Sequence, residues 1–351
     1  MLSDARINEL KRFAGEIRME TLKAISHVPS GHLGGALSMA EVLSVLYGEQ
    51  LKCDPENPKW EDRDWLVLSK GHCGPGLYAA LALKGFFPME MLETLNKPHT
   101  DLPSHADRNH TPGIDMCTGS LGQGASTAAG VAMGMKMDGN PNYTYLILGD
   151  GELDEGQGWE MALFANTKHL DNLIAFVDYN KLQIDGRTDN DDVCNLGDIA
   201  AKFASFGWYA QTVNGHEVAE INEAIENAKK NTGCPSVIVL DTIKGYGWSK
   251  TAGQVGSHSR GVSPEDLAEA LADKVLSPLL SKEDKEAGKK AYEVLETYKG
   301  QDLERKEYEP LYACAKELAD KQGKKGFFVT CDTYVTMSDG TGIVHIAPAF
   351  G

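Results

Sequence analysis

The strongest constraint on how this chain can fold is a Gly-Asp-Gly turn set between two apolar segments that are a helix length apart. Residues 145–148 are apolar and lead directly into the turn around Asp150, and residues 173–177 are apolar and end shortly before Asn180. This spacing predicts one β-strand–helix–β-strand unit with parallel strands. Because the carboxyl ends of neighbouring parallel strands meet at one edge of a sheet, we expect Asp150 and Asn180 to lie close together.

The residue types at this edge suit a hard cation that holds a diphosphate. Asp150 offers a carboxylate oxygen and Asn180 an amide oxygen, and Mg²⁺ prefers oxygen ligands while it keeps contacts to phosphates. The flanking glycines let backbone N–H groups approach an anion closely. Ca²⁺ would accept the same ligands. An isolated Gly-Asp-Gly turn is usually an ordinary loop, so the prediction depends on the complete pattern.

Apolar runs alternate with helix-length segments over roughly the first 270 residues. This alternation predicts an α/β protein in three layers, with a parallel sheet covered by helices on both faces. Ser38 is expected to be the N-cap of a helix, with Glu41 completing a capping box. Three further strands are predicted at 65–68, 209–213 and 236–240. Other helices are predicted at 4–27, 77–83 and 122–137.

Composition excludes several classes of partner. The net charge of −17, from 34 basic and 51 acidic residues, disfavours an extended nucleic-acid or anionic-membrane surface. No apolar run has the length of a membrane span, and the N-terminal segment lacks the apolar core of a signal peptide. Seven cysteines without a Cys-x-x-Cys pair indicate reduced thiols and a cytoplasmic location.

With these motifs in place, residues 1–271 resemble the N-terminal half of transketolase, as found in split transketolases. Two positions depart from the family: Leu33 stands where proline is usual, and Ser104-His105-Ala106 replaces Gly-His-Pro. Both departures keep the neighbouring histidine. The runs that carry the resemblance, in the family's order and spacing, are Ser30-Gly31-His32, Ser69-Lys70-Gly71-His72, Thr118 to Gly124, Gly149 to Gly156 and Asp178 to Gly186.

The resemblance implies a thiamine diphosphate-binding fold, specifically its diphosphate-binding domain, with thiamine diphosphate and Mg²⁺ (or Ca²⁺) as cofactors. The metal ligands carried over from the family are Asp150, Asn180 and the carbonyl of Leu182. Glu155 belongs in the family to an acidic network that couples two cofactor sites, although a carboxylate at a helix start is an alternative explanation for it. The cofactor-binding positions are His72, Gly119, Leu121, Gly149, Asp150, Gly151, Glu155, Asn180, Leu182, Ile184 and His258.

Four loop histidines fall on catalytic positions of the family. His72 and His258 are expected near the diphosphate and the reacting carbon, and His32 and His105 near the hydroxyl groups of the substrate. Imidazoles can hydrogen-bond to sugar hydroxyls and phosphates and can move protons near neutral pH. A single loop histidine is more often structural, so the prediction depends on all four positions matching.

The implied activity is the transfer of a two-carbon ketol unit between sugar phosphates, as in the pentose phosphate pathway. In the family, the glutamate that activates the cofactor and the main phosphate-binding basic residues belong to a separate pyrimidine-binding domain. The chain therefore resembles half an active site, which predicts self-association into a heterotetramer with a C-terminal, pyrimidine-binding partner subunit. Two alternatives stay open. One is a non-catalytic binding protein of the same fold, and the other is a deoxyxylulose phosphate synthase-like or sulfosugar-specific transferase.

The last part of the chain has a different character. Residues 274–299 are dense in Lys, Glu and Ala and predict a solvated helix, and residues 327–346 have a hairpin-like β pattern. From about residue 267 to 351 the sequence resembles a fragment of isoleucyl-tRNA synthetase near its editing insertion, carried by Tyr308-Glu309-Pro310-Leu311 and Gly340 to Gly351. This change of resemblance suggests a chimera. We expect residues 272–351 not to form an independent functional domain.

Overall fold

The computed structural model describes residues 2–271, 283–284 and 289–290. The chain divides into two compact units, residues 1–270 and 271–351. In the second unit the described residues form a short antiparallel pair, β6 (Glu283–Asp284) with β7 (Lys289–Lys290). The helix predicted over 274–299 is therefore wrong at these four residues, since helix-forming composition alone does not fix a helix. The hairpin pattern at 327–346 lies outside the described residues.

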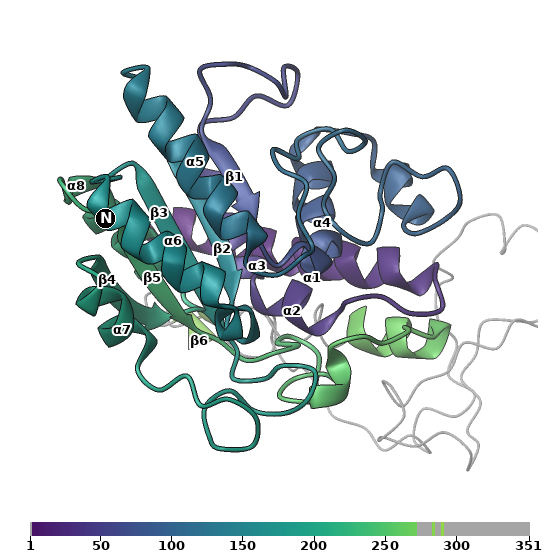
Figure 1. The fold of residues 1–351 in the computed structure, drawn as a ribbon. Coiled ribbons are helices and arrows are strands. Elements are labelled where there is room, and N and C mark those ends of the chain that lie inside the picture. The colour runs from purple at the N-terminus through teal and green to yellow at the C-terminus, as the bar shows by residue number, and fades with distance from the viewer. Residues whose placement is uncertain (1, 272–282, 285–288, 291–351) are drawn as a thin grey trace, which may run out of the picture. The chain divides into compact units, whose positions relative to one another are not determined.

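The first unit is built on a five-stranded sheet in which every pairing is parallel (Figure 1). Every residue of β2 is buried, as expected for a strand in the middle of a parallel sheet. The predicted strands are confirmed, with ends that shift by at most two residues. In spatial order the strands are β1 (Trp65–Leu68), β2 (Thr144–Gly149), β3 (Leu173–Tyr179), β5 (Ser236–Asp241) and β4 (Tyr209–Asn214).

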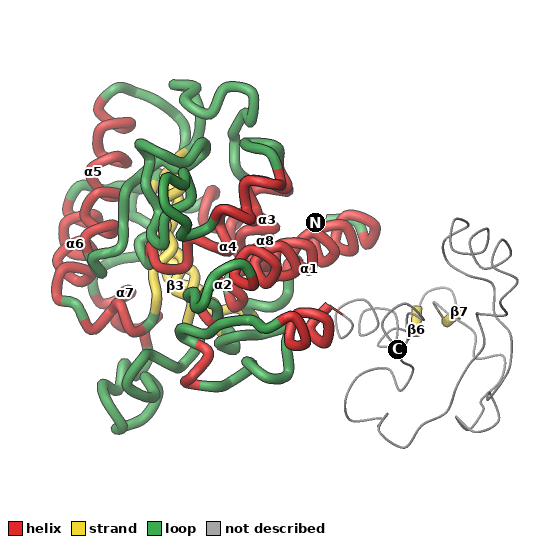
Figure 2. Tube along the Cα trace, turned by 90° about the vertical axis from the view of Figure 1, so that its right-hand side faces the viewer, coloured by secondary structure: helices red, strands yellow, loops and turns green. Residues whose placement is uncertain are grey.

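Helices cover both faces of the sheet, which confirms the predicted three-layer architecture (Figure 2). Alternate residues of β2 point to opposite faces: Tyr145 and Ile147 join one apolar core, and Leu146 and Leu148 join the other. The first core is completed by α1 (Asp4–Ser26), α2 (Gly34–Ser38), α3 (Ala40–Val45), α4 (Gly74–Lys84) and α8 (Val218–Lys230). The second is completed by α5 (Gln123–Met137), α6 (Gly156–Thr167) and α7 (Ile199–Ser205).

Short helical turns occupy several connections. They are the π-helical η1 (Leu46–Gln50) and the 3₁₀ turns η2 (Gly71–Cys73), η3 (Met89–Thr94), η4 (Gly151–Asp154) and η5 (Val255–Ser257). Residues 264–271 are also helical. No helix among the described residues is long and apolar enough to cross a lipid bilayer.

The predicted helix start at Ser38 is wrong. Ser38 is the last residue of α2 and caps no helix, because its hydroxyl donates instead to the Asp178 carboxylate at 2.6 Å. Glu41 likewise makes no capping box, since its buried carboxylate pairs with the Arg18 guanidinium. Both side chains have tertiary partners that replace the local capping bonds which their spacing suggested.

A buried carboxylate at the end of β3 collects donors from four parts of the chain. Asp178 is fully buried and accepts hydrogen bonds from Lys70 Nζ at 2.5 Å, Ser38 Oγ at 2.6 Å, Thr242 Oγ1 at 2.5 Å and Asn180 Nδ2 at 3.0 Å. Burial raises the pKa of Asp178, but the Lys70 charge and these hydrogen bonds outweigh burial and hold it below its usual value. Asp178 and Lys70 therefore form a charged pair inside the protein, beside the carboxyl ends of the strands.

We expect Asp178→Ala to lower the free energy of unfolding by about 3–5 kcal/mol, because the substitution leaves the Lys70 ammonium buried and unpaired. The matched control is Asp189→Ala, which breaks a solvent-screened pair with Arg187 and should change the free energy of unfolding far less. Urea denaturation followed by tryptophan fluorescence measures both. Equal effects of the two substitutions would contradict the assigned burial of the Lys70–Asp178 pair.

Candidate active site

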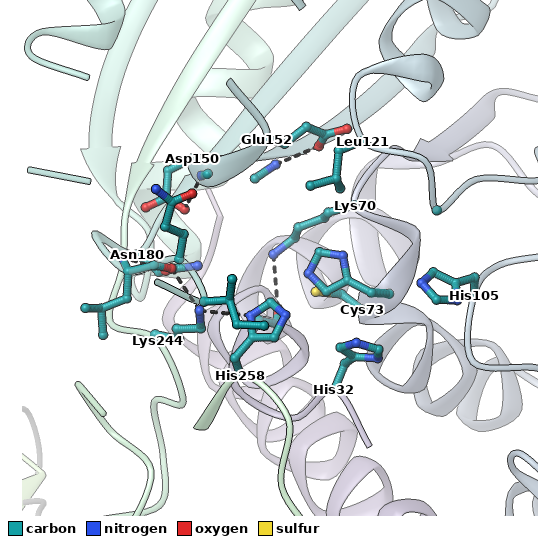
Figure 3. A pocket seen from close by; sticks show the side chains of 18 residues that line it. His32, Lys70, Cys73, His105, Leu121, Asp150, Glu152, Asn180, Lys244 and His258 are labelled. Atoms are coloured by element: carbon teal, nitrogen blue, oxygen red, sulfur yellow. Dashed lines mark hydrogen bonds between the residues drawn. The ribbon is translucent and has the colours of Figure 1, made fainter. Parts of the chain in front are cut away.

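The segments that follow β1, β2, β3 and β5, together with residues 32–35 at the start of α2, enclose a cavity of about 240 Å³ at the carboxyl ends of these strands (Figure 3). Of the residues predicted to form the site, only Glu155 does not line it. The predicted residues that the structure brings together here are His32, His72, His105, Gly119, Leu121, Gly149, Asp150, Gly151, Asn180, Leu182, Ile184 and His258.

Asp150 and Asn180 lie on the same wall of the cavity because β2 and β3 are paired neighbours, with Gly149 opposite Asp178. Both side chains are buried. The Asn180 amide is oriented by its Nδ2, which donates to Asp178, while its Oδ1 accepts the Leu182 N–H at 3.2 Å. The amide oxygen and a carboxylate are thereby presented on one edge of the sheet.

The Leu182 carbonyl also faces a cation in this structure. Lys244 Nζ donates to the Leu182 carbonyl oxygen at 2.9 Å and lies 3.1 Å from Nδ1 of His258. The carbonyl predicted to be a metal ligand thus points into the cavity. Its hydrogen-bond partner there is the ammonium group of Lys244. Burial is the main cause that lowers the pKa of Lys244.

Two glycines form walls where a side chain would not fit. Gly119 has a φ of 141°, and a Cβ atom there would lie 2.7 Å from the His105 ring. A Cβ atom on Gly151 would lie 2.8 Å from Cβ of Gln183. The glycines keep the backbone at the cavity surface, which suits close approach of a phosphate group.

The oxygen atoms of Asp150, Asn180 and the Leu182 carbonyl fit as ligands of a divalent cation that is bound together with a diphosphate. Burial, and after it the nearby Asp178, raises the pKa of Asp150 to about 6, so a bound cation would favour its ionised form. Among the described residues no group of three or more His, Cys, Asp or Glu side chains is placed to hold a metal. A metal here would therefore depend on the amide and carbonyl oxygens beside Asp150. Lys70 and Lys244 line the same cavity and supply positive charge for an anion.

The four predicted histidines all line the cavity and form one cluster, of which Figure 3 labels His32, His105 and His258. The His32 ring centroid lies 5.2 Å from that of His72, 5.6 Å from that of His105 and 5.5 Å from that of His258. The His72 and His258 centroids are 5.2 Å apart. Each ring comes from a different loop, so only the folded chain brings the cluster together.

The cluster is electrically neutral at physiological pH. Burial, followed by the neighbouring His72 and His105, lowers the pKa of His32 to about 4. Burial and Lys70 lower the pKa of His72 to about 4, and burial and Lys244 lower the pKa of His258 to about 3. Neutral imidazoles offer one donor and one acceptor nitrogen each, as the recognition of hydroxyl groups requires.

Glu152 is a site residue that the sequence did not reveal. Its buried carboxylate accepts hydrogen bonds from Ser69 Oγ at 2.5 Å, Gly122 N at 2.8 Å and Gly149 N at 3.0 Å. It therefore joins three loops of the cavity wall. The other lining residues missed in the sequence are Gly35, Lys70, Cys73, Gln183 and Lys244.

Glu155 does not line the cavity that the other predicted site residues share. The turn η4 directs Glu152 inward and leaves Glu155 exposed at the start of α6, where its side chain makes no capping bond. The alternative explanation, a carboxylate near a helix start, agrees with this position.

Residues 10–278 match the family of transketolase thiamine diphosphate-binding domains. The chain belongs to the transketolase family. It corresponds to the N-terminal part of transketolase and is 52% identical over 265 residues to the 6-deoxy-6-sulfo-D-fructose transketolase subunit of Clostridium sp., covering 76% of this chain and 96% of the relative. It is 36% identical to an apulose-4-phosphate transketolase subunit of Phocaeicola vulgatus, covering 73% and 90% of the two chains.

Longer transketolases match over part of their length. Transketolase 1 of Escherichia coli is 36% identical over 270 residues, which cover 74% of this chain and 40% of the relative. The solved structure of transketolase from Leishmania mexicana superposes with a TM-score of 0.72 at 31% identity, covering 76% of this chain and 41% of the other. The chain therefore spans about two fifths of these transketolases.

The lowered histidine pKa values predict a loss of stability in acid. Between about pH 6.5, the pKa of an unfolded histidine, and pH 4, the unfolded chain binds more protons at His32, His72 and His258 than the folded chain does. The histidine contribution to the free energy of unfolding should therefore fall as the pH is lowered from 7 to 5. The raised pKa values of Asp64, Asp115, Asp150 and Glu152 act in the opposite direction, so a histidine substitution is needed to isolate the histidine contribution.

Urea denaturation at pH 7 and pH 5 measures this dependence. His258→Gln should make it shallower, and Ser259→Ala, which removes no titratable group, should leave it unchanged. An unchanged pH dependence in His258→Gln would contradict the lowered pKa of that ring.

Proposed function

We propose that this chain is the N-terminal subunit of a thiamine diphosphate- and Mg²⁺-dependent transketolase that transfers a two-carbon ketol unit between sugar phosphates. The observation that carries the proposal is that one cavity is lined both by the oxygen-bearing residues Asp150, Asn180 and Leu182 and by four histidines. Family membership supports thiamine diphosphate as the cofactor.

In this proposal, Asp150, Asn180 and the Leu182 carbonyl would hold Mg²⁺, with Ca²⁺ as a substitute. Gly149 and Gly151 would let the diphosphate approach the backbone. Gly119, Leu121, Ile184, His72 and His258 would contact the rest of the bound cofactor. When bound, thiamine diphosphate supplies the carbanion chemistry that no amino-acid side chain can provide.

The histidines would handle the hydroxyl groups and protons of the substrate. Burial lowers the pKa of His32 and of His105, which favours the neutral imidazole, and a neutral imidazole can donate from one ring nitrogen and accept at the other. His72 and His258 lie nearer to Lys70 and Lys244, respectively, where a bound diphosphate would be. Proton transfer by a placed group contributes about 10²–10⁴-fold to a rate.

The proposed enzyme is incomplete without a second chain. No residue of this sequence resembles the glutamate that activates the cofactor, so we propose a C-terminal, pyrimidine-binding partner subunit, with self-association into a heterotetramer. In such an assembly Glu155 would belong to the acidic network between cofactor sites. We propose a cytoplasmic location and a role in pentose phosphate metabolism. Nothing in the acidic composition favours a nucleic-acid or membrane partner.

A sulfonated ketose is the second candidate substrate. It is favoured by the 52% identity to a 6-deoxy-6-sulfo-D-fructose transketolase subunit, which matches over 96% of its length. The ratio of kcat/KM for fructose 6-phosphate and for 6-deoxy-6-sulfo-D-fructose distinguishes the two donors. A non-catalytic binding protein of the same fold would show no turnover with either donor.

The ligand assignment predicts that Asp150→Ala abolishes Mg²⁺-dependent binding of thiamine diphosphate, because it removes the only charged group among the proposed ligands. Asp189→Ala, an acidic residue that does not line the cavity, is the control and should bind as the wild type does. Isothermal calorimetry at fixed Mg²⁺ measures both affinities. Unchanged affinity in Asp150→Ala would refute the assignment.

The decisive functional experiment is a ketol-transfer assay with thiamine diphosphate and Mg²⁺, with and without a pyrimidine-binding subunit. We expect no turnover by the isolated chain and turnover by the mixture. A chain ending at residue 271 should behave identically, since we propose that the synthetase-like residues 272–351 contribute no function. Full turnover by the isolated chain would mean that the activating carboxylate lies in this sequence, and a loss on truncation would show that 272–351 are integrated.

A further inference from the structure

The carboxylate of Asp150 has a complete set of hydrogen-bond partners on one of its two oxygens. Its Oδ2 accepts the Lys181 N–H at 2.6 Å and the Thr188 hydroxyl at 2.9 Å. Among the residues that the structure describes, its Oδ1 accepts a single bond, from Gly151 N at 2.9 Å. Each carboxylate oxygen has about two lone-pair directions, so Oδ2 is saturated and Oδ1 has one direction free.

The Thr188 hydroxyl reaches Asp150 because the loop after β3 folds back on itself. Thr188 is fully buried, and its backbone is fixed by bonds from Thr188 N to the Lys181 carbonyl at 3.1 Å and from Leu196 N to the Thr188 carbonyl at 3.0 Å. An antiparallel bridge joins Leu182 to Arg187 in the same loop.

Lys181 at the base of this loop adopts a left-handed φ of 67°, which is uncommon for a residue with a side chain. Lys181 stands between Asn180 and Leu182 in the chain, and its backbone N–H donates the hydrogen bond to Asp150. One loop therefore carries two of the proposed metal ligands and also holds the carboxylate of the third. Strained backbone that is fixed by such surroundings is common at functional sites.

We propose that Thr188 is a positioning residue for Asp150: its hydroxyl, together with the Lys181 N–H, occupies Oδ2 and leaves Oδ1 as the single oxygen that faces the cation. This inference rests on the proposed function. A carboxylate that binds through one oxygen suits the octahedral geometry of Mg²⁺, whereas Ca²⁺ readily accepts carboxylates through both oxygens. Thr188 thereby favours Mg²⁺ over Ca²⁺ at this site.

The test is Thr188→Val, which keeps the shape of the side chain and removes the hydroxyl. Partners of metal ligands typically contribute about 10–100-fold to metal affinity. We therefore expect calorimetry on the full chain to show thiamine diphosphate binding weakened about tenfold with Mg²⁺ and clearly less with Ca²⁺. Thr188→Ser, which restores a hydroxyl, should recover the wild-type ratio of the two affinities.

The control is Thr144→Val, a fully buried threonine on β2 whose hydroxyl donates to the sulfur of Met135 at 3.6 Å, and it should leave both affinities unchanged. Wild-type binding by Thr188→Val, or an equal loss with both metals together with a lowered melting temperature, would overturn the inference and assign Thr188 a merely structural role. If the wild-type chain binds thiamine diphosphate with neither metal, the proposed function itself fails, and the inference fails with it.

Discussion

The buried ion pair between Lys70 and Asp178 is the interaction on which the geometry of the cavity depends. It joins the segment after β1 to the end of β3, and Ser38 and Thr242 add α2 and the segment after β5 to the same carboxylate. Replacing a buried ion pair by apolar side chains is often neutral for stability. We therefore interpret the pair as fixing the position of the groups around it. The fourth donor to Asp178 is the Asn180 amide nitrogen, and this hydrogen bond fixes the amide oxygen toward the cavity.

Burial shifts the pKa values of the carboxyl and of the imidazoles around the cavity in opposite directions, with the same result for their charge. Removal from water raises the pKa of Asp150 and lowers the pKa of His32, His72 and His258, so every one of these groups is shifted toward its neutral form. The Lys244 ammonium, which contacts the Leu182 carbonyl, supplies positive charge in the same cavity. A bound metal diphosphate would place a cation beside the Asp150 carboxylate and an anion beside the Lys70 and Lys244 ammonium groups. The pattern is that of a site whose charges are balanced only when a ligand is present.

The sequence predicts the sheet and the pair of Asp150 and Asn180 from local patterns, whereas the histidines and the other cavity residues were predicted from the resemblance to transketolase. Fully buried parallel strands are recognisable as apolar runs, and the carboxyl ends of β2 and β3 must meet, so Asp150 and Asn180 are found by spacing alone. Lys244 and Glu152 were missed because their inward direction depends on burial against distant segments. Three acids follow the Gly-Asp-Gly turn, and only the turn geometry of η4 decides that Glu152 points inward and Glu155 outward. The capping role expected for Ser38 failed for the same reason, since a tertiary partner replaced a local one.

Above all, we propose that the oxygens at the ends of β2 and β3 hold a divalent cation together with the diphosphate of the cofactor. Anomalous diffraction from crystals grown with thiamine diphosphate and Mn²⁺ in place of Mg²⁺ tests this assignment most directly. We predict one strong peak within about 2.0–2.3 Å of Asp150 Oδ1, the Asn180 amide oxygen and the Leu182 carbonyl. Bound thiamine diphosphate with no peak at this edge, or with the metal held by the histidine cluster instead, would contradict it.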